Sequence, residues 1–150
     1  MPFKLYKMQE TIFLVDDDQF SLEMQKKMIS EIGNFDIYLF TSGQECINQL
    51  ILEPKIIFLD YNMNPINGIE ILKKIKRFNP SIYIVFVSGQ ETIKVAVDAL
   101  KYGAFDYIVK GENEFQNLQR VLEKIKRIQE LEKKKSITKK INNLFNAIIN

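Results

Sequence analysis

Six side chains of this 150-residue chain could handle a phosphoryl group, and each lies directly beyond a short apolar run. They are Asp16, Asp17, Asp18, Asp60, Ser88 and Lys110. Carboxylates are ligands for hard divalent cations such as Mg²⁺, and an ammonium group places a positive charge beside a phosphate. A carboxylate can also attack phosphorus and form an acyl phosphate. Brought together, these side chains predict a site for Mg²⁺ and a phosphoryl group.

The apolar runs predict the elements that would bring these side chains together. Runs rich in Ile, Val and Phe that alternate with longer helical patterns are typical of buried parallel strands. We predict strands at 11–15, 35–40, 56–59, 82–87 and 105–109. We predict helices at 20–32, from after Ser42 to about 52, from the 64–68 loop to 78, at 92–102 and from about 113. In an open parallel sheet, the functional site lies beyond the carboxyl ends of the strands.

Five strand–helix units predict an α/β fold, a flavodoxin-like (βα)5 three-layer sandwich with strand order 2-1-3-4-5. In this order the first and third strands are neighbours, so Asp16 and Asp60 would lie side by side. On the first helix we predict an apolar face made of Phe20, Met24, Met28 and Ile32. The last helix is predicted to be long, because apolar residues keep helical spacing from Leu118 onward.

Composition excludes several kinds of chemistry. The chain has no histidine, which excludes Ser-His and Cys-His nucleophile pairs and any phosphohistidine of its own. The single cysteine, Cys46, excludes an internal disulfide, is expected to be a buried core thiol, and fits a cytoplasmic location. No apolar run approaches the ~18 residues of a membrane span, so we expect no membrane partner. Residues 1–110 carry a net charge of −2 and residues 111–150 a net charge of +4.

Each chemical position also has a plain structural interpretation. An Asp after a strand is often a helix N-cap, and Asp18 suits that role. Ser88 and Asp60 could be turn residues, and Lys110 could be solvated. Three adjacent acids repel one another unless a cation or hydrogen bonds offset their charge. The joint occurrence at four strand ends favours the functional interpretation.

Four segments resemble the response-regulator receiver domains of bacterial two-component signalling, over about residues 10–130. They are Phe-Leu-Val-Asp-Asp-Asp (13–18), Phe-Leu-Asp-Tyr-Asn-Met (58–63) with Gly68 eight residues beyond Asp60, Val-Ser-Gly (87–89) and Ala-Phe-Asp-Tyr-Ile-Val-Lys (104–110). The resemblance implies that Asp60 is the phosphoacceptor and that Lys110 pairs with the phosphoryl group. It implies Mg²⁺ held by Asp17 directly, by Asp16 mostly through water, by Asp60, and by the backbone carbonyl of Asn62. It makes Ser88 the switch hydroxyl and Tyr107 the switch aromatic.

Two positions depart from the family pattern. Asn64 stands where a proline is usual four residues after the acceptor, with Pro65 one position later. Gly111 stands where the family usually has a proline, in a cis peptide, after the lysine. A cis bond is improbable without proline, so we expect a trans or more mobile loop there. Neither change removes a reactive group.

The resemblance implies a phosphoryl acceptor and not an enzyme, apart from self-catalysed phosphorylation and dephosphorylation. The donor would be a phosphohistidine on a sensor kinase or a phosphotransfer protein. The output would be a population shift at the face of the fourth helix, fifth strand and fifth helix. We predict an N-terminal extension at 1–10, a receiver domain at 11–132 and a basic helical tail or linker at 133–150.

Several alternatives stay open. The predicted tail has four possible arrangements: it packs on the domain, frays in solvent, pairs with another copy or leads into a further domain. A homodimer could form through the tail or through the face of the fourth helix, fifth strand and fifth helix. The chain is a stand-alone receiver or the N-terminal piece of a longer regulator. Nucleic acid is not expected, because no groove-reading motif accompanies the lysines. The rival functions are a haloacid-dehalogenase-like phosphatase with Asp16 as nucleophile, and a pseudo-receiver that only binds partners.

Overall fold

The computed structural model describes residues 9–63, 65–89 and 93–150, and its centre is a five-stranded parallel sheet. The strands are β1 (Thr11–Val15), β2 (Asp36–Phe40), β3 (Ile56–Asp60), β4 (Tyr83–Ser88) and β5 (Asp106–Val109). Their order is β2-β1-β3-β4-β5, and every neighbouring pair is parallel. The predicted strand order is therefore confirmed.

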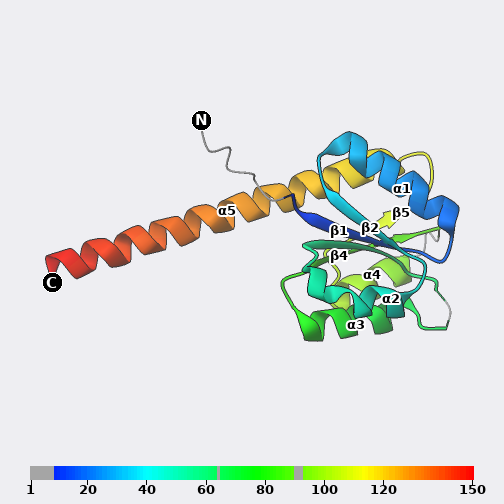
Figure 1. The fold of residues 1–150 in the computed structure, drawn as a ribbon, viewed down its shortest axis with the longest axis horizontal. Helices are drawn as coiled ribbons and strands as arrows, with labels where there is room; N and C mark the ends of the chain where they lie inside the picture. Colours follow the sequence, from blue (N-terminus) through cyan, green and yellow to red (C-terminus); the bar gives the residue numbers. More distant parts are fainter. Residues whose placement is uncertain (1–8, 64, 90–92) are drawn as a thin grey trace. The chain divides into compact units, whose positions relative to one another are not determined.

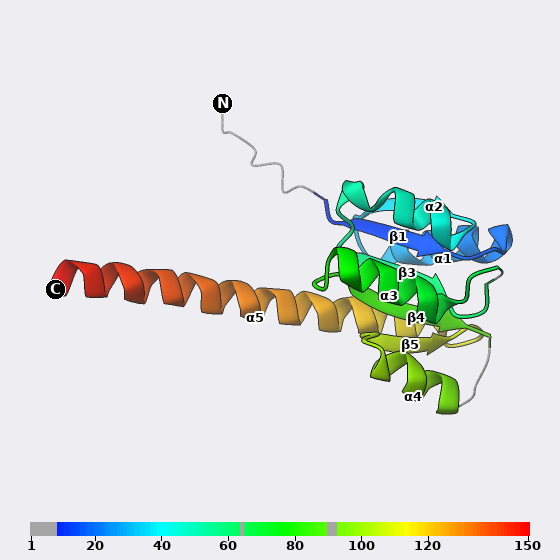
Figure 2. The ribbon, with the colours of Figure 1, turned by 90° about the horizontal axis from the view of Figure 1, so that it is seen from below.

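Helices cover both faces of this sheet, as the predicted sandwich requires. They are α1 (Gln19–Ile32), α2 (Gly43–Asn48), α3 (Gly68–Phe78), α4 (Ile93–Lys101) and α5 (Glu114–Ile149), with a 3₁₀ turn η1 (Leu50–Leu52) after α2. Figure 1 and Figure 2 show α1 on one face of the sheet and α2, α3 and α4 on the other. A parallel sheet covered in this way is buried on both sides, which explains its continuous apolar runs.

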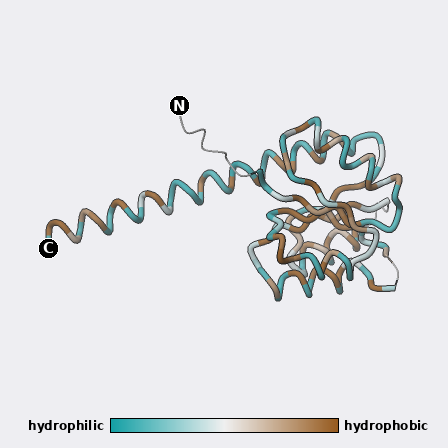
Figure 3. The backbone as a smooth tube through the Cα atoms, viewed as in Figure 1, coloured by the Kyte–Doolittle hydropathy of each residue, from teal (hydrophilic) through white to brown (hydrophobic). Residues whose placement is uncertain are grey.

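The core of the fold is built on the central strands. All five residues of β3 are buried, and Phe13, Phe58 and Phe86 on β1, β3 and β4 are fully buried. Figure 3 shows these strands as the hydrophobic centre of the fold. Cys46 packs in this core, where burial raises the pKa of its thiol to about 12, so the prediction of a core thiol is confirmed.

Local signals in the sequence define where the helices begin and end. The side chains of Asp18, Ser42 and Asn67 accept hydrogen bonds from backbone N–H groups in the first turns of α1, α2 and α3. Gly33 closes α1, and Gly103, with φ of 106°, follows α4 in a conformation that favours glycine. Asp18 is therefore a helix cap, as predicted.

The predicted apolar face of α1 is wrong. Phe20 is 73% exposed and Met24 43% exposed, whereas Leu22, Gln25 and Ile29 are buried. Residues spaced exactly four apart advance by about 40° around a helix at each step, so the predicted row winds away from the sheet. The true face follows mixed three- and four-residue spacing.

The second predicted helix is also shorter than expected. It ends at Asn48, and a 3₁₀ turn replaces its final α-helical turn. Pro54 disfavours helical geometry at the preceding residue, and Glu53 has a left-handed φ of 55°. The chain therefore tightens before β3 instead of continuing as an α-helix.

The chain divides into two compact units, one ending at Leu118 and one comprising Gln119–Asn150. The long C-terminal helix is confirmed, since α5 runs for 36 residues across this division. Within the second unit Val121, Leu122 and Ile125 are buried, whereas residues 130–150 are all exposed. The predicted boundary between residues 132 and 133 stays a prediction.

Some predictions fall on residues that are not described. Three of them lie outside the described residues: most of the predicted N-terminal extension, the departure from the family pattern at Asn64, and the predicted start of the fourth helix at Thr92. In the parts of the chain that are described, no helix is long and apolar enough to cross a membrane.

Candidate functional site

Three carboxylates meet at the carboxyl edge of the sheet. Val15 of β1 pairs with Leu59 of β3, so Asp16 and Asp60 follow neighbouring positions on adjacent strands. Carboxylate oxygens of Asp16, Asp17 and Asp60 lie within 4.8 Å of one another. Asp16 and Asp60 are buried, and Asp17 is exposed. The predicted meeting of the β1 and β3 acids is therefore observed.

Hydrogen bonds of the backbone fix the acidic triplet. The N–H of Asp16 donates to the carbonyl of Phe40 at 3.0 Å, which continues the pairing with β2. The Oδ1 atom of Asp16 accepts from the N–H of Asp18 at 2.9 Å. Asp18 in turn accepts from the N–H of Phe20 at 3.0 Å. Asp16 and Asp17 thus belong to the carboxylate cluster, and Asp18 caps α1.

Lys110 brings a positive charge to the same cluster. Its Nζ atom lies 2.6 Å from Oδ2 of Asp16 and 3.9 Å from Oδ2 of Asp60. The strand end is held by the N–H of Lys110, which donates to the carbonyl of Ser88 at 2.9 Å. The ammonium therefore reaches both buried carboxylates but lies closer to Asp16.

The surroundings of Asp60 oppose its ionisation. Burial, followed by the negative charge of Asp16, raises the pKa of Asp60 to about 6, although Lys110 and the N–H of Asn62 act to lower it. Burial acts to lower the pKa of Lys110, but the hydrogen bond to Asp16 and the charges of Asp60 and Asp16 outweigh it and raise the pKa. Lys110 is thus charged, and a further cation would favour the ionised form of Asp60.

The donor set suits a hard divalent cation. Three carboxylates of close spacing face one ammonium, which leaves the group with an excess of negative charge. Mg²⁺ takes oxygen ligands, commonly one or two carboxylates, and keeps several waters. The exposed side of Asp17 leaves room for such waters. The residues present therefore fit Mg²⁺.

Asn62 lies in the loop after β3. Its backbone N–H donates to Oδ1 of Asp60 at 3.2 Å, which orients the carboxylate. Its role as a ligand through the backbone carbonyl stays a prediction. Gly68 closes this loop by donating its N–H to the carbonyl of Tyr61 at 3.0 Å.

Ser88 lies on β4, which pairs with the strand that carries Asp60, and Tyr107 lies on β5, the next strand of the sheet. Ser88 is the last residue of β4 and is fully buried; its neighbour Val87 pairs with Asp60. Tyr107 pairs with Phe86 in the sheet, and its half-buried side chain packs against the core. Ser88 thus lies at the carboxyl edge of the sheet, as predicted. The switch roles of Ser88 and Tyr107 stay predictions.

Glu114 belongs to this neighbourhood and was missed from the sequence. Burial raises the pKa of this first residue of α5. A hydrogen bond from the backbone of Gly111 and the positive charge of Lys110 act to lower that pKa, and the negative charge of Asp16 acts to raise it. The signal was its position four residues after Lys110, at a helix start that follows a strand end. It adds a carboxylate close to the lysine.

Gly111 explains the second departure from the family pattern. Its φ is 142°, a conformation that favours glycine. Proline requires φ near −65°, so it could not occupy this backbone. The loop after Lys110 is therefore shaped around glycine, and the predicted trans bond is not tested.

Comparison with known families agrees with this geometry. Residues 12–126 match the family model of the response regulator receiver domain. The chain belongs to this family. As a receiver domain of two-component response regulators, it has the fold of chemotaxis-type regulators, and the phosphatase and pseudo-receiver alternatives gain no support.

Curated and solved relatives point the same way. The chemotaxis protein CheY of Thermotoga maritima is 32% identical over 69% of this chain and 87% of its own length. The transcriptional regulatory protein ZraR of Escherichia coli is 33% identical over 75% of this chain. The match covers only 25% of the length of ZraR, so this chain spans about a quarter of that regulator. A chain of the CheX-CheY-BeF3-Mg²⁺ complex of Borrelia burgdorferi superimposes on this chain with a TM-score of 0.69 at 25% identity. The superposition covers 77% of this chain and 89% of the Borrelia chain.

Proposed function

We propose that this receiver domain accepts a phosphoryl group on Asp60 from a phosphohistidine of a partner kinase or phosphotransfer protein. The observation that carries the proposal is the buried carboxylate pair Asp16 and Asp60 with Lys110 within reach of both. No residue of this chain can be the phosphohistidine donor, because the sequence has no histidine. Receiver domains interact with such kinases or phosphotransfer proteins.

The residues of the chain have distinct tasks in this transfer. One carboxylate oxygen of Asp60 forms the new bond to phosphorus while the phosphorus–nitrogen bond breaks and its electron pair stays on the partner's histidine. The N–H of Asn62 orients Asp60 through Oδ1. Ser88, buried at the end of β4, donates its hydroxyl to a phosphoryl oxygen. Catalysis is mainly positioning and charge neutralisation.

A bound Mg²⁺, held by Asp16, Asp17, Asp60 and the carbonyl of Asn62, would neutralise charge on the phosphoryl oxygens. The ammonium of Lys110 lies 2.6 Å from Asp16 in this structure, so Lys110 would have to leave Asp16 in order to contact a phosphoryl oxygen. A cation near Asp16 would favour that change of partner. Among the solved relatives, the Borrelia CheX–CheY complex holds Mg²⁺ and BeF3, which supports a cation at this edge.

The chain acts on itself and turns over no separate substrate. Phosphorylation shifts the population at the face of α4, β5 and α5 through Ser88 and Tyr107, and hydrolysis of the acyl phosphate reverses it. Tyr107 suits this role because it is half-buried against the core and can repack.

Labelling by acetyl phosphate and Mg²⁺ tests the proposal. Asp60→Asn removes the acceptor and should abolish labelling, a loss of at least ~100-fold. Asp18→Asn is the matched control, because it makes the same change in the neighbouring acidic triplet 16–18, at a residue whose side chain caps α1. Labelling of the control should stay within about twofold of the wild type. Retained labelling of Asp60→Asn would refute the assignment.

A further inference from the structure

The last helical turns of α5 form a surface that phosphoryl transfer does not use. Residues 133–149, which we term the basic amphipathic segment, are helical and exposed throughout. The segment contains five lysines and no acidic residue. Its charge is therefore uniformly positive, unlike that of the receiver body, whose residues 1–110 carry a net charge of −2.

One side of the basic amphipathic segment is apolar. Ile137, Ile141, Leu144 and Ile148 follow one another at spacings of four, three and four, which places them on one helical face. Phe145 also belongs to this apolar side. These side chains are between 48% and 75% exposed. Figure 3 shows the resulting alternation of hydrophilic and hydrophobic residues along the helix. A face of this size in water indicates an apolar partner.

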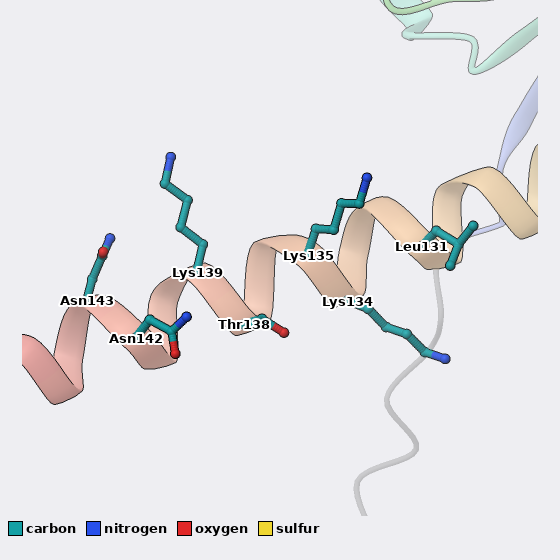
Figure 4. Close-up of a pocket in the computed structure, with 7 residues that line it drawn as sticks. All are labelled: Leu131, Lys134, Lys135, Thr138, Lys139, Asn142 and Asn143. Carbon is teal, nitrogen blue, oxygen red and sulfur yellow. The ribbon is translucent and has the colours of Figure 1, made fainter.

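The lysines do not form a pocket for a small ligand. Figure 4 shows the side chains of the shallow depression around Lys134, Lys135 and Lys139 fanning outward from a single helix. Lys135 and Lys139 extend on one side and Lys134 on another. Dispersed cations of this kind suit an extended anionic surface rather than one bound anion.

The sequence of the segment disfavours dimerisation through its apolar face. The seam of Ile137, Ile141, Leu144 and Ile148 covers about two heptads, whereas coiled coils are recognised over three or four. Continued upstream, the same spacing meets Lys134, then Glu130 and then Arg127. Two such segments would also bring ten lysines together without a compensating acid, and this repulsion disfavours pairing.

We propose that the basic amphipathic segment binds the surface of an anionic lipid bilayer. The helix would lie in the plane of the interface, with its apolar face among the acyl chains and its lysines over the headgroups. An anionic bilayer surface complements the five positive charges of the segment, and it can do so without aligning each lysine with a particular partner residue. The sequence alone led us to expect no membrane partner because no span is present, but a surface contact needs only an exposed amphipathic face.

The composition of the segment also favours a partner. Asn142, Asn143 and Asn146 are weak helix formers, and these last turns of α5 are exposed, so packing contributes little to their helical form. Burial of the apolar face at an interface would stabilise the helical form. Helicity of the segment should therefore rise on binding.

Flotation of the full chain with vesicles tests this proposal. Vesicles of equal phosphatidylglycerol and phosphatidylcholine should bind the chain at least ~10-fold more strongly than pure phosphatidylcholine, and high salt should weaken the binding. Absence of binding to the anionic vesicles would overturn the proposal, and an acidic protein surface would become the better partner.

A pair of neighbouring substitutions separates the apolar face from simple charge attraction. Leu144→Asp places a charge on the apolar face and should reduce binding at least ~10-fold. Asn143→Asp makes the same change of charge off that face and should reduce binding by no more than about fivefold. Both side chains are exposed, so the fold should survive in both variants.

Equal losses for the two variants would overturn the proposal. So would a lipid-free dimer, detected by light scattering, that Leu144→Asp disrupts, because the face would then be covered by a second copy.

Discussion

The carboxyl edge of the sheet buries charged groups, whereas the basic amphipathic segment exposes apolar side chains. The edge buries Asp16 and Asp60 with a single ammonium for compensation, whereas the segment exposes apolar side chains such as Leu144 and Phe145. Buried charge and exposed apolar surface are both unfavourable. The proposed cation at the edge and the proposed anionic bilayer at the segment would each relieve one of them. Both proposed binding sites thus lie where the fold leaves an unfavourable feature uncompensated.

Two phenylalanines test the contrast between the two regions most strongly. Phe86 is fully buried in β4, whereas Phe145 is 61% exposed. Phe86→Ala should lower the free energy of unfolding by about 3–5 kcal/mol, because it leaves a cavity in the core. Phe145→Ala should change it by less than ~0.5 kcal/mol. Urea unfolding of both variants measures the difference, and a comparable loss for Phe145→Ala would show that the segment is packed in solution.

Two glycines sharpen the description of the carboxyl edge. A Cβ at Gly68 would lie 2.6 Å from the ring of Phe86 and 2.9 Å from the backbone oxygen of Asp60. Gly68→Ala should therefore cost about 1–3 kcal/mol of stability and weaken labelling of Asp60, because the loop must move. Gly89→Ala, where a Cβ meets nothing within 4 Å, is the control. If thermal melts of the two variants coincide, α3 does not approach the acceptor as closely as described.

The pH dependence of stability tests the burial of Asp60. Since its pKa is raised to about 6, the folded chain holds a proton that the unfolded chain releases from about pH 4 upward, and stability falls as pH rises through this window. At pH 7, Asp60→Asn should be more stable than the wild type by about 1–2 kcal/mol, and below pH ~4 the difference should vanish. Mg²⁺ should reduce the gap at pH 7. Urea unfolding across pH gives the profile, and a gap that grows in acid would contradict it.

The fold could be predicted because buried parallel strands leave a clear trace in a sequence. Runs such as Ile56–Leu59 are apolar on both faces, and the residue that ends each run marks the edge of the sheet. The meeting of Asp16 with Asp60 followed from the strand order alone. The face of α1 was mispredicted because the buried Gln25 is polar and interrupts the apolar pattern; its amide donates to Ser21 Oγ at 3.3 Å.

Side-chain pairing at the site could not be predicted in the same way. A strand end places Lys110 at the edge, but its closer approach to Asp16 than to Asp60 depends on rotamers and on the charges around both. The part played by Glu114 depends on its burial, which the spacing of residues does not report. Gly111 was recognised as a departure, and only its φ of 142° explains why glycine stands there.

Direct mapping of the phosphorylated residue tests the central claim. The full chain is phosphorylated with acetyl phosphate and Mg²⁺, the acyl phosphate is reduced with borohydride so that the modified aspartate becomes homoserine, and peptides are sequenced by mass spectrometry. We expect a single modified position, at Asp60. Modification of Asp16 instead, or of no aspartate in the cluster, would contradict the account.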